Sequence, residues 1–335
     1  MTGPAPEVAT VRLAVRGALA DSTVPGQTVL VACSGGPDSL ALAAATAFEA
    51  PRLGLLTGAV VVDHGLQPNS DQVAAATAEQ LHALGLDPVL LRRVEVTGPG
   101  GPEAAARRAR YTALRQAAAE TSADWVLLGH TRDDQAETVL LGLGRGSGPR
   151  SIAGMRSVDP PWLRPLLDVD RAATTRACAA EGLIPWQDPH NADRRFVRVR
   201  LRLEVLPLLE AVLGGGVAAA LARTATLLRQ DIDALDDQAD RLVEELASAT
   251  DVSAADLAAL PAALLGRVLR GWLARAGVPA LTSTHLSAAS ALLVDWHGQG
   301  PVALPGGWQV CRRNGRLLVR PGVAPPVAGQ EPDGG

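Results

Sequence analysis

A glycine-rich turn stands directly after a short apolar segment near the start of the chain. Residues 34–39 read Ser-Gly-Gly-Pro-Asp-Ser and follow the β-branched and apolar residues 28–33. The apolar segment predicts a strand, and residues 39–48 have the spacing of a helix. Glycines let the backbone approach an anion closely, and the first turn of a helix presents unpaired N–H groups, so this arrangement predicts a nucleotide-binding turn. The residues expected to bind are Ser34, Gly35, Gly36, Pro37, Asp38 and Ser39.

The turn differs from two common phosphate-binding loops. A Walker A loop uses a lysine that reaches the outer phosphates, but this chain contains no lysine. A dinucleotide-binding loop has G-x-G-x-x-G spacing, whereas Gly35 and Gly36 are adjacent. An aspartate beside phosphates needs a cation between them, so Asp38 predicts a bridging Mg²⁺ ion. The alternative is a turn whose residues serve only backbone geometry and helix capping.

The composition limits the class of protein. The chain has 335 residues, of which 47% are hydrophobic, enough for a sizeable core and two domains. The net charge of −4 excludes a general polycation, so contact with nucleic acid would need local patches of arginine. Three widely spaced cysteines without a C-x-x-C pair argue against an iron–sulfur site, a zinc site and a disulfide framework. Free thiols, no signal-peptide pattern and no convincing membrane span predict a cytoplasmic protein that contacts no membrane.

Apolar segments alternate with helical patterns over the first two hundred residues. The strand-like segments are 28–33, 55–63, 88–96 and 124–129, and the helix-like segments between them are 39–48, 71–84 and 103–120. This alternation predicts an α/β fold with a doubly wound parallel sheet, similar to a Rossmann fold. Ligands of such sheets lie beyond the carboxyl ends of the strands.

From about residue 195 the pattern becomes mainly helical. Helical spacing covers 196–213, with an interruption at Pro207, and continues in 217–246, 254–276 and 283–293, and turn residues within 302–320 predict a small β-hairpin unit. The expected organisation is a lead-in helix (1–24), a catalytic domain (25–212), a mainly α-helical domain with a small C-terminal β unit (213–322) and a disordered tail (323–335).

Two further motifs stand at the ends of expected strands. Asp63 and His64 follow the second strand and could bind a ribose, an adenine or a phosphate, although loop structure with a helix cap would also explain them. Gly129 and His130 follow the fourth strand. Because the carboxyl ends of parallel strands meet at one edge of the sheet, we expect all four residues beside the nucleotide.

The helices carry two candidate groups of catalytic side chains. Asp134 and Glu137 are three residues apart and share one face of a helix, where paired carboxylates could hold a metal or a cationic amine. An acidic first turn that complements the helix dipole is the alternative. Arg110 shares a face with Arg107 and could stabilise charge on a phosphate, or lie on a solvated face with its stem packed on alanines.

A strongly basic segment follows at residues 194–202. It contains five arginines in nine residues, with Phe196 among them. Such a segment is typical of contact with a nucleic-acid backbone, and an aromatic ring could stack on a base. The alternative is a surface helix without a partner. The expected RNA-binding residues are Arg194, Arg195, Arg198, Arg200 and Arg202.

The turn resembles the SGGxDS signature of the PP-loop ATP pyrophosphatases. Together the motifs are similar to one family within that group, the tRNA(Ile)-lysidine synthetases. Its motifs occur here in the same order over about residues 25 to 210: SGGPDS, VDHGLQPNS, EAAARRARY, GHTRDDQAET, and DPHNAD followed by the R-x-R-x-R segment. The chain looks like a short form of the family, and Val199 stands where the family has an asparagine between arginines.

This resemblance implies a reaction with ATP and Mg²⁺ as cofactors and with tRNA(Ile) and free lysine as partners. ATP adenylates the C2 oxygen of the wobble cytidine in a CAU anticodon, pyrophosphate leaves, and the lysine amine then attacks C2 and expels AMP. The implied catalytic residues are Asp38, acting through Mg²⁺, Arg110, steadying the α-phosphate or the intermediate, and Asp134 with Glu137, gripping lysine. The turn would hold pyrophosphate, and the basic segment would hold RNA phosphates.

Three other functions remain open from the sequence. A PP-loop tRNA thiolase would need cysteines near the site, where only Cys33 is adjacent. An amide-forming ligase would need a glutaminase domain, for which no room is evident. A non-catalytic nucleotide- or RNA-binding module is disfavoured by the intact acidic residues. The sequence leaves the oligomeric state open, a homodimer included.

Overall fold

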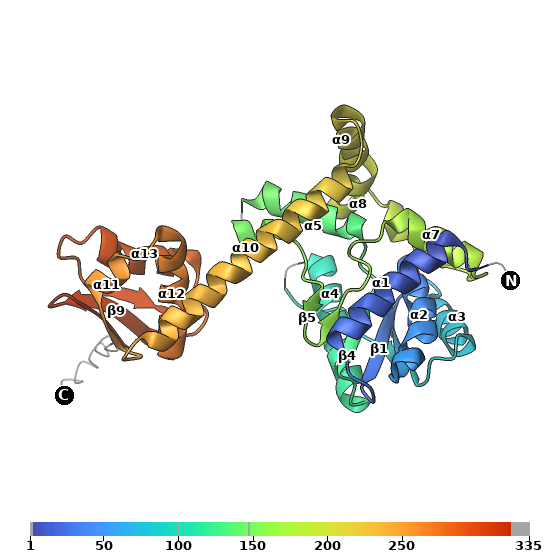
Figure 1. Cartoon of the computed structure of the whole chain (residues 1–335), viewed down its shortest axis with the longest axis horizontal. Coiled ribbons are helices and arrows are strands. Elements are labelled where there is room, and N and C mark those ends of the chain that lie inside the picture. The colour runs from blue at the N-terminus through green and yellow to red at the C-terminus, as the bar shows by residue number, and fades with distance from the viewer. Residues whose placement is uncertain (1–2, 100, 147, 323–335) are drawn as a thin grey trace, which may run out of the picture. The chain divides into compact units, whose positions relative to one another are not determined.

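The computed structural model describes residues 3–99, 101–146 and 148–322, apart from the side chains of Pro102 and Glu103. The chain forms two compact units, Met1–Leu228 and Arg229–Gly335 (Figure 1). The division differs from the expected boundary at residue 213, because helix α10 (Val217–Glu245) runs without a break from the first unit into the second. The expected tail at 323–335 lies outside the described residues.

The first unit is built on a six-stranded sheet in the order β3-β2-β1-β4-β6-β5. β1 pairs in parallel with both β2 and β4, while β5 is antiparallel to β6. The predicted parallel sheet is therefore confirmed, with one antiparallel edge strand in addition. The strands are β1 (Thr28–Cys33), β2 (Leu56–Asp63), β3 (Val89–Arg93), β4 (Trp125–Leu128), β5 (Val158–Asp159) and β6 (Trp162–Leu163).

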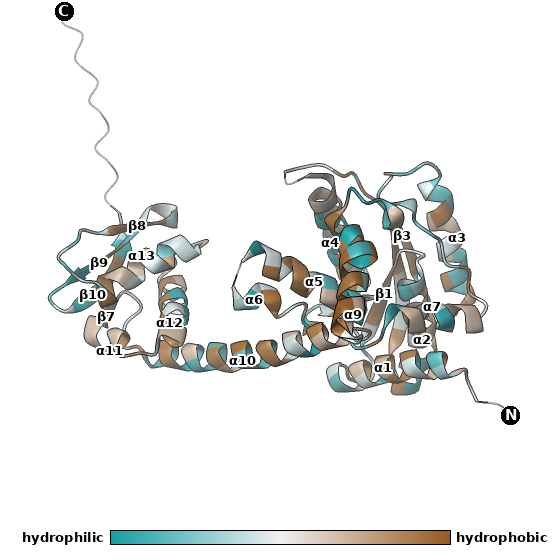
Figure 2. Ribbon diagram, turned by 90° about the horizontal axis from the view of Figure 1, so that it is seen from above, coloured by the Kyte–Doolittle hydropathy of each residue, from teal (hydrophilic) through white to brown (hydrophobic). Residues whose placement is uncertain are grey.

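Helices cover both faces of this sheet (Figures 1 and 2). Side chains alternate between the two faces of a strand. Val29 and Val31 of β1 pack with residues of α1, α2, α3 and α7, whereas Leu30 packs with Leu114 and Ala117 of α4. The doubly wound arrangement follows from this alternation. The helices of the unit are α1 (Pro6–Ser22), α2 (Pro37–Glu49), α3 (Ser70–Ala83), α4 (Gly101–Glu120), α5 (Arg132–Arg145), α6 (Pro149–Ile152) and α7 (Arg171–Ala180).

The strand order places the expected motifs side by side. The chain proceeds outward from β1 through β2 to β3 and then returns to β4 on the other side of β1. Such a reversal creates a crevice at the carboxyl ends of the two central strands. Gly129 follows β4 at this point, where a Cβ atom would lie 3.1 Å from backbone atoms of Asp38. Glycine therefore lets the end of β4 approach the phosphate-binding turn.

The basic segment forms a helix with an irregular middle. α8 (Val197–Arg200) continues into a π-helical turn (Leu201–Val205) and then α9 (Leu206–Leu213). The expected interruption at Pro207 is replaced by the π-helical turn before it. Pro207 lies in the first turn of α9, directly after this irregular turn. Because proline lacks an N–H group and its ring crowds the preceding turn, a regular helix would be disrupted here.

The second unit packs three helices beside a four-stranded antiparallel sheet in the order β7-β10-β9-β8. The expected helix at 254–276 ends at residue 258 and restarts after Pro261, and β7 adds a strand that the sequence did not indicate. Trp272 is fully buried in the core of this unit. The elements are β7 (Asp251–Ser253), α11 (Ala254–Ala258), α12 (Ala262–Arg275), α13 (Ser283–Val294), β8 (Val302–Leu304), β9 (Trp308–Arg313) and β10 (Arg316–Pro321).

Among the described residues no single helix is long and apolar enough to cross a membrane. The segments Val197–Leu213 and Val217–Glu245 reach that length and hydropathy only together, and they are bent by 96° relative to each other.

Candidate active site

A cavity of about 480 Å³ opens at the carboxyl ends of β1, β2 and β4. This volume lies within the range of small-molecule sites. Its wall contains the phosphate-binding turn, Asp63 and His64 after β2, and Gly129 and His130 after β4. Arg110, Asp134 and Arg202 reach it from helices. The structure thus gathers most of the predicted site residues around one cavity. The predicted residues that do not line it are Gly35, Glu137, Arg194, Arg195, Arg198 and Arg200.

Hydrogen bonds within the phosphate-binding turn and a close contact at Gly35 fix its backbone conformation. Gly35 has a φ of +80°, and a Cβ atom there would lie 2.5 Å from the Thr77 hydroxyl, so only glycine fits. The Ser39 hydroxyl donates to the Gly36 carbonyl at 3.0 Å and accepts from the Ser34 N–H at 3.1 Å. The turn ends at Pro37, the first residue of α2. The positive dipole end of α2 therefore points at the cavity edge, as an anion site requires.

Buried nitrogen atoms beside this turn favour an anionic ligand. Within the described part of the chain, Arg110 Nε, His64 Nδ1 and His130 Nδ1 are buried without a hydrogen-bond partner. Burial, with Arg110 nearby, lowers the pKa of His130 to about 3, so this ring is neutral at pH 7. Burial also lowers the pKa of Arg110, but a guanidinium stays charged at neutral pH. Arg110 is thus a buried cation with an unpaired nitrogen at the cavity wall.

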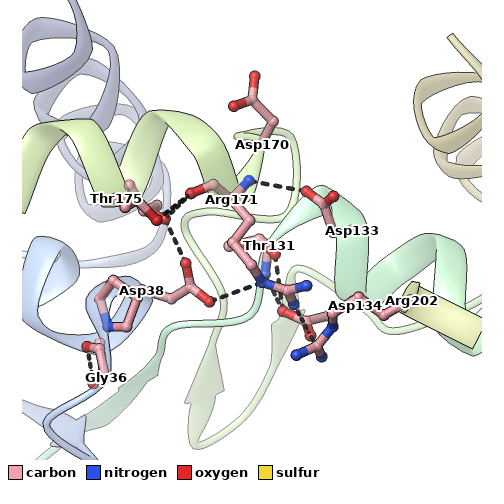
Figure 3. A network of polar contacts seen from close by, with 12 residues as sticks. Gly36, Asp38, Thr131, Asp133, Asp134, Asp170, Arg171, Thr175 and Arg202 are labelled. Atoms are coloured by element: carbon pink, nitrogen blue, oxygen red, sulfur yellow. Dashed lines mark hydrogen bonds and ion pairs between the residues drawn. The ribbon is translucent and has the colours of Figure 1, made fainter. Parts of the chain in front are cut away.

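Asp38 of the phosphate-binding turn lies close to Asp134 and Glu137 of α5, and we call these three residues the acidic cluster. All three carboxylates converge on the guanidinium of Arg171. Figure 3 shows Asp38 and Asp134 beside this side chain. Arg171 Nε lies 3.3 Å from Asp38, its Nη2 2.6 Å from Asp134. Its Nη1 lies 3.4 Å from Glu137. One side chain therefore joins the phosphate-binding turn to the first turn of α5.

Asp134 fits both interpretations that the sequence left open, a ligand-binding carboxylate and an acidic residue that stabilises the first turn of a helix. Its Oδ2 accepts from the Thr131 N–H at 2.8 Å and from the Thr131 hydroxyl at 2.9 Å, which caps α5. Its Oδ1 faces Arg171. Burial alone would raise the pKa of Asp134, but Arg171 and the Thr131 N–H lower it below its usual value. One oxygen of this carboxylate is structural, and the other is directed at the site.

The carboxylates of Asp38 and Glu137 are also held by hydrogen bonds and ion pairs to neighbouring side chains. Asp38 Oδ1 accepts from the Thr174 hydroxyl, and burial raises the pKa of Asp38. Glu137 is fully buried, and its Oε1 lies 2.8 Å from Arg202 Nε as well as 3.4 Å from Arg171. Its Oε2 makes no hydrogen bond to any described residue, and Arg198 Nη1 is 3.9 Å away.

Comparison with known proteins agrees with this geometry. Residues 11–209 match the PP-loop domain, and residues 253–318 match the TilS substrate binding domain. The tRNA(Ile)-lysidine synthase of Thermobifida fusca is 54% identical over 322 residues, which cover 95% of this chain and 99% of that protein. The tRNA(Ile)-lysidine synthase of Streptomyces coelicolor is 50% identical over 351 residues, covering 96% and 100%. The chain belongs to the tRNA(Ile)-lysidine synthase family.

A solved structure supports the fold of this lysidine synthase family member. The U34-tRNA thiolase of Methanococcus maripaludis superposes with a TM-score of 0.56 at 18% identity. The match covers 67% of this chain and 80% of the thiolase. At this level of identity the similarity concerns the fold alone.

The basic segment of this lysidine synthase family member has two faces. Arg198 and Arg202 point toward Glu137, and Arg202 lies in the π-helical turn, a feature frequent at functional sites. Arg194, Arg195 and Arg200 are 71%, 83% and 60% exposed. The sequence did not separate these two groups. Val199, in place of the family's asparagine, is buried.

Arg171 lines the same cavity, and the sequence did not predict it as a site residue. It is the first residue of α7, and Asp170 caps this helix by accepting from the Ala173 N–H at 2.7 Å. The Arg171 N–H also donates to Asp133 Oδ2 at 2.9 Å, which fixes the start of α7 against α5. The local sequence shows a helix cap and nothing else, because the partners of the guanidinium are distant in the chain.

The residues of the site could hold Mg²⁺ only together with the phosphates of a bound nucleotide. The described residues contain no group of three or more His, Cys, Asp or Glu side chains that could hold a metal ion. Mg²⁺ in nucleotide sites needs only one or two carboxylates in addition to the phosphates, and Asp38 beside the turn meets that need. An ion at Asp38 would replace Arg171 on Oδ2, because Thr174 already engages Oδ1.

Proposed function

We propose that this chain is a tRNA(Ile)-lysidine synthase. It uses ATP to adenylate the C2 oxygen of the wobble cytidine in the CAU anticodon of tRNA(Ile), which releases pyrophosphate. The lysine amine then attacks C2, and AMP leaves with that oxygen. The observation that carries the proposal is the acidic cluster beside a phosphate-binding turn at one cavity. The acidic cluster can bind an amine and the turn can bind a triphosphate, and the reaction needs both substrates.

The phosphate end of the cavity binds ATP. The turn at 34–39 and the start of α2 hold the phosphates that leave as pyrophosphate. Asp38 is the protein ligand of Mg²⁺, which when bound neutralises phosphate charge. Arg110, with its buried and unpaired nitrogen, faces the α-phosphate and stabilises charge that develops there. Asp63 and His64 bind the ribose or the base.

The acidic end binds free lysine. Asp134 Oδ1 and Glu137 bind an ammonium group by charge-assisted hydrogen bonds. The attacking amine must be neutral, so a carboxylate of the cluster accepts its proton before C2 is attacked. His130 remains neutral and adds no repelling charge. The tRNA is held by phosphate contacts to the exposed arginines Arg194, Arg195 and Arg200, and by residues 253–318.

The thiolase alternative is disfavoured by the cysteines beside the turn. Cys33 and Cys178 are both buried. Burial raises the pKa of Cys33, and it raises the pKa of Cys178 to about 12 with a further contribution from Asp38. A persulfide or thiolate chemistry needs an accessible thiol with a low pKa. Neither residue meets that requirement.

The direct test combines the full chain, ATP, Mg²⁺, labelled lysine and a tRNA(Ile) transcript with a CAU anticodon. We expect label in the RNA and equal amounts of AMP and pyrophosphate. A transcript that carries GAU in place of CAU is the matched control and should remain unlabelled. Absence of label from the CAU transcript, or pyrophosphate release that does not depend on tRNA, would refute the proposal.

A further inference from the structure

Arg171 occupies the position where the proposed function requires the substrate amine. Its three guanidinium nitrogens each face one member of the acidic cluster. Burial alone would lower the pKa of Arg171, but Asp134, Asp38 and Glu137 raise it above its usual value. The side chain is therefore a permanent cation at the centre of the cluster.

The carboxylate oxygens around Arg171 are almost all engaged. Asp38 accepts from Thr174 and Arg171, and Asp134 accepts from Thr131 and Arg171. Glu137 Oε1 faces both Arg171 and Arg202. Among the carboxylate oxygens of the acidic cluster, only Glu137 Oε2 makes no hydrogen bond to a described residue. Two guanidinium groups already share Glu137 Oε1, but only Arg171 also lies close to Asp134 Oδ1, at 2.6 Å against 3.9 Å for Arg202. An ammonium that bridges Asp134 and Glu137 would be a third cation at these oxygens, so repulsion favours the withdrawal of Arg171.

We propose that Arg171 is an internal competitor of the substrate lysine. It is a positioning residue: its guanidinium holds the acidic cluster in place in the free enzyme and withdraws when an ammonium group binds. The inference rests on the proposed function, which assigns Asp134 and Glu137 to lysine. It adds that lysine binding includes the displacement of a side chain of the protein itself.

The same guanidinium connects the two substrate sites. Nε faces Asp38 of the phosphate-binding turn, while both Nη atoms face residues of α5. A ligand at the turn that draws Asp38 away from Nε removes one of the three contacts that keep Arg171 in the amine position. ATP with Mg²⁺ therefore increases the affinity for lysine, and lysine increases the affinity for ATP by the same factor.

Arg171→Met tests the competition directly. Methionine removes the cation and keeps an unbranched side chain and the N–H bond to Asp133. Isothermal titration of the full chain with lysine, without ATP or tRNA, should give a Kd at least about tenfold lower than that of the unmodified chain. Arg171→Lys restores the charge and should return the Kd toward the unmodified value. Arg176→Met is the control, because Arg176 lies on the same helix, pairs with Glu7 and is exposed.

Lysine binding by Arg171→Met that is equal, weaker or undetectable would overturn the inference. If this variant does not fold, the unmodified chain provides a second measurement. Nitrogen-15 spectra of its arginine Nε–H groups should show the Arg171 signal, identified by its loss in Arg171→Lys, moving when lysine saturates the site. Hexanoate, which has the carbon chain of lysine without its amines, should leave the signal in place. A stationary signal at saturating lysine would also overturn the inference.

The two proposals can fail separately. If the unmodified chain makes lysidine but Arg171→Met does not bind lysine more tightly, only the competition is wrong. If Arg171→Met binds lysine more tightly but the unmodified chain never labels tRNA, the proposed function is wrong and the amine site remains. Titration with lysine in the presence of ATP then measures the link between the sites, which should be smaller in Arg171→Met than in the unmodified chain.

Discussion

Replacing Glu137 with glutamine tests the acidic cluster with little change of shape. Glu137 is fully buried, and its Oε1 lies 2.8 Å from Arg202 Nε. Glutamine keeps a carbonyl oxygen that can accept this hydrogen bond, so the variant loses the negative charge and not the contact. In Glu137→Gln, an ammonium group of lysine bound at this position would likewise keep a hydrogen bond but lose its attraction to a negative charge.

The expected effect follows from the difference between two kinds of hydrogen bond. A hydrogen bond to a charged group contributes about 1.5–3 kcal/mol, and a neutral one about 0.5–1.5 kcal/mol. The loss is therefore about 1–2 kcal/mol, which corresponds to an increase of about 5- to 30-fold in the KM for lysine. The KM for ATP should change by less than about twofold, because Glu137 does not contact the phosphate-binding turn.

Steady-state incorporation of labelled lysine into a CAU transcript measures both constants. Asp133→Asn is the matched control on the same helix. Its carboxylate accepts from the Arg171 N–H at 2.9 Å, and an asparagine oxygen can replace it. The KM for lysine should stay within about twofold in this control. An unchanged KM for lysine in Glu137→Gln, together with a raised KM for ATP, would place Glu137 in the nucleotide site and refute the reasoning.

Three further predictions concern other parts of the molecule. The folded chain keeps His130 neutral down to about pH 3, whereas an unfolded histidine binds a proton below about pH 6.5. The free energy of unfolding should therefore fall as the pH drops from about 6.5 to about 3. In His130→Asn, thermal denaturation measured over this pH range should show a smaller decrease. Changing Arg194, Arg195 and Arg200 together to alanine should reduce the slope of log Kd for tRNA against log salt by about 2, and an unchanged slope would remove these residues from the RNA contact. Trp272→Ala should destabilise the second unit by about 3–5 kcal/mol in urea denaturation while the ATP affinity of the first unit is unchanged.

Much of the first unit could be predicted because its signals are local. A strand followed by Ser34–Ser39 and a helix needs no distant partner to be recognised. Parallel strands then bring Gly129 and His130 to the same sheet edge by a general rule of topology. The irregular parts were not predictable in the same way. The π-helical turn at Leu201–Val205 and the two-residue strands β5 and β6 are too short to leave a periodicity that the sequence pattern could show.

The centre of the site was not predictable from the sequence for a different reason. The Arg171 guanidinium contacts Asp38 and Asp134, which are separated from it by 133 and 37 residues in the chain. A spacing rule on one helix can pair Asp134 with Glu137, but it cannot show which cation the fold inserts between them. The same limitation applies to Arg202, which the sequence grouped with exposed arginines although its partner is buried.

Arg171 should have opposite effects on the binding and the reactivity of lysine. Its positive charge competes with the ammonium form for Asp134 and Glu137, which weakens binding. After it withdraws from the carboxylate oxygens, the guanidinium is still tethered to the start of α7 close to the amine. A nearby cation lowers the pKa of that amine and so increases the neutral fraction that can attack C2. Arg202, 2.8 Å from Glu137, adds to both effects. Removal of the Arg171 charge should therefore lower the KM for lysine and the kcat together. A group that served only to hold the fold would not produce that combination, because disordered carboxylates would raise the KM instead.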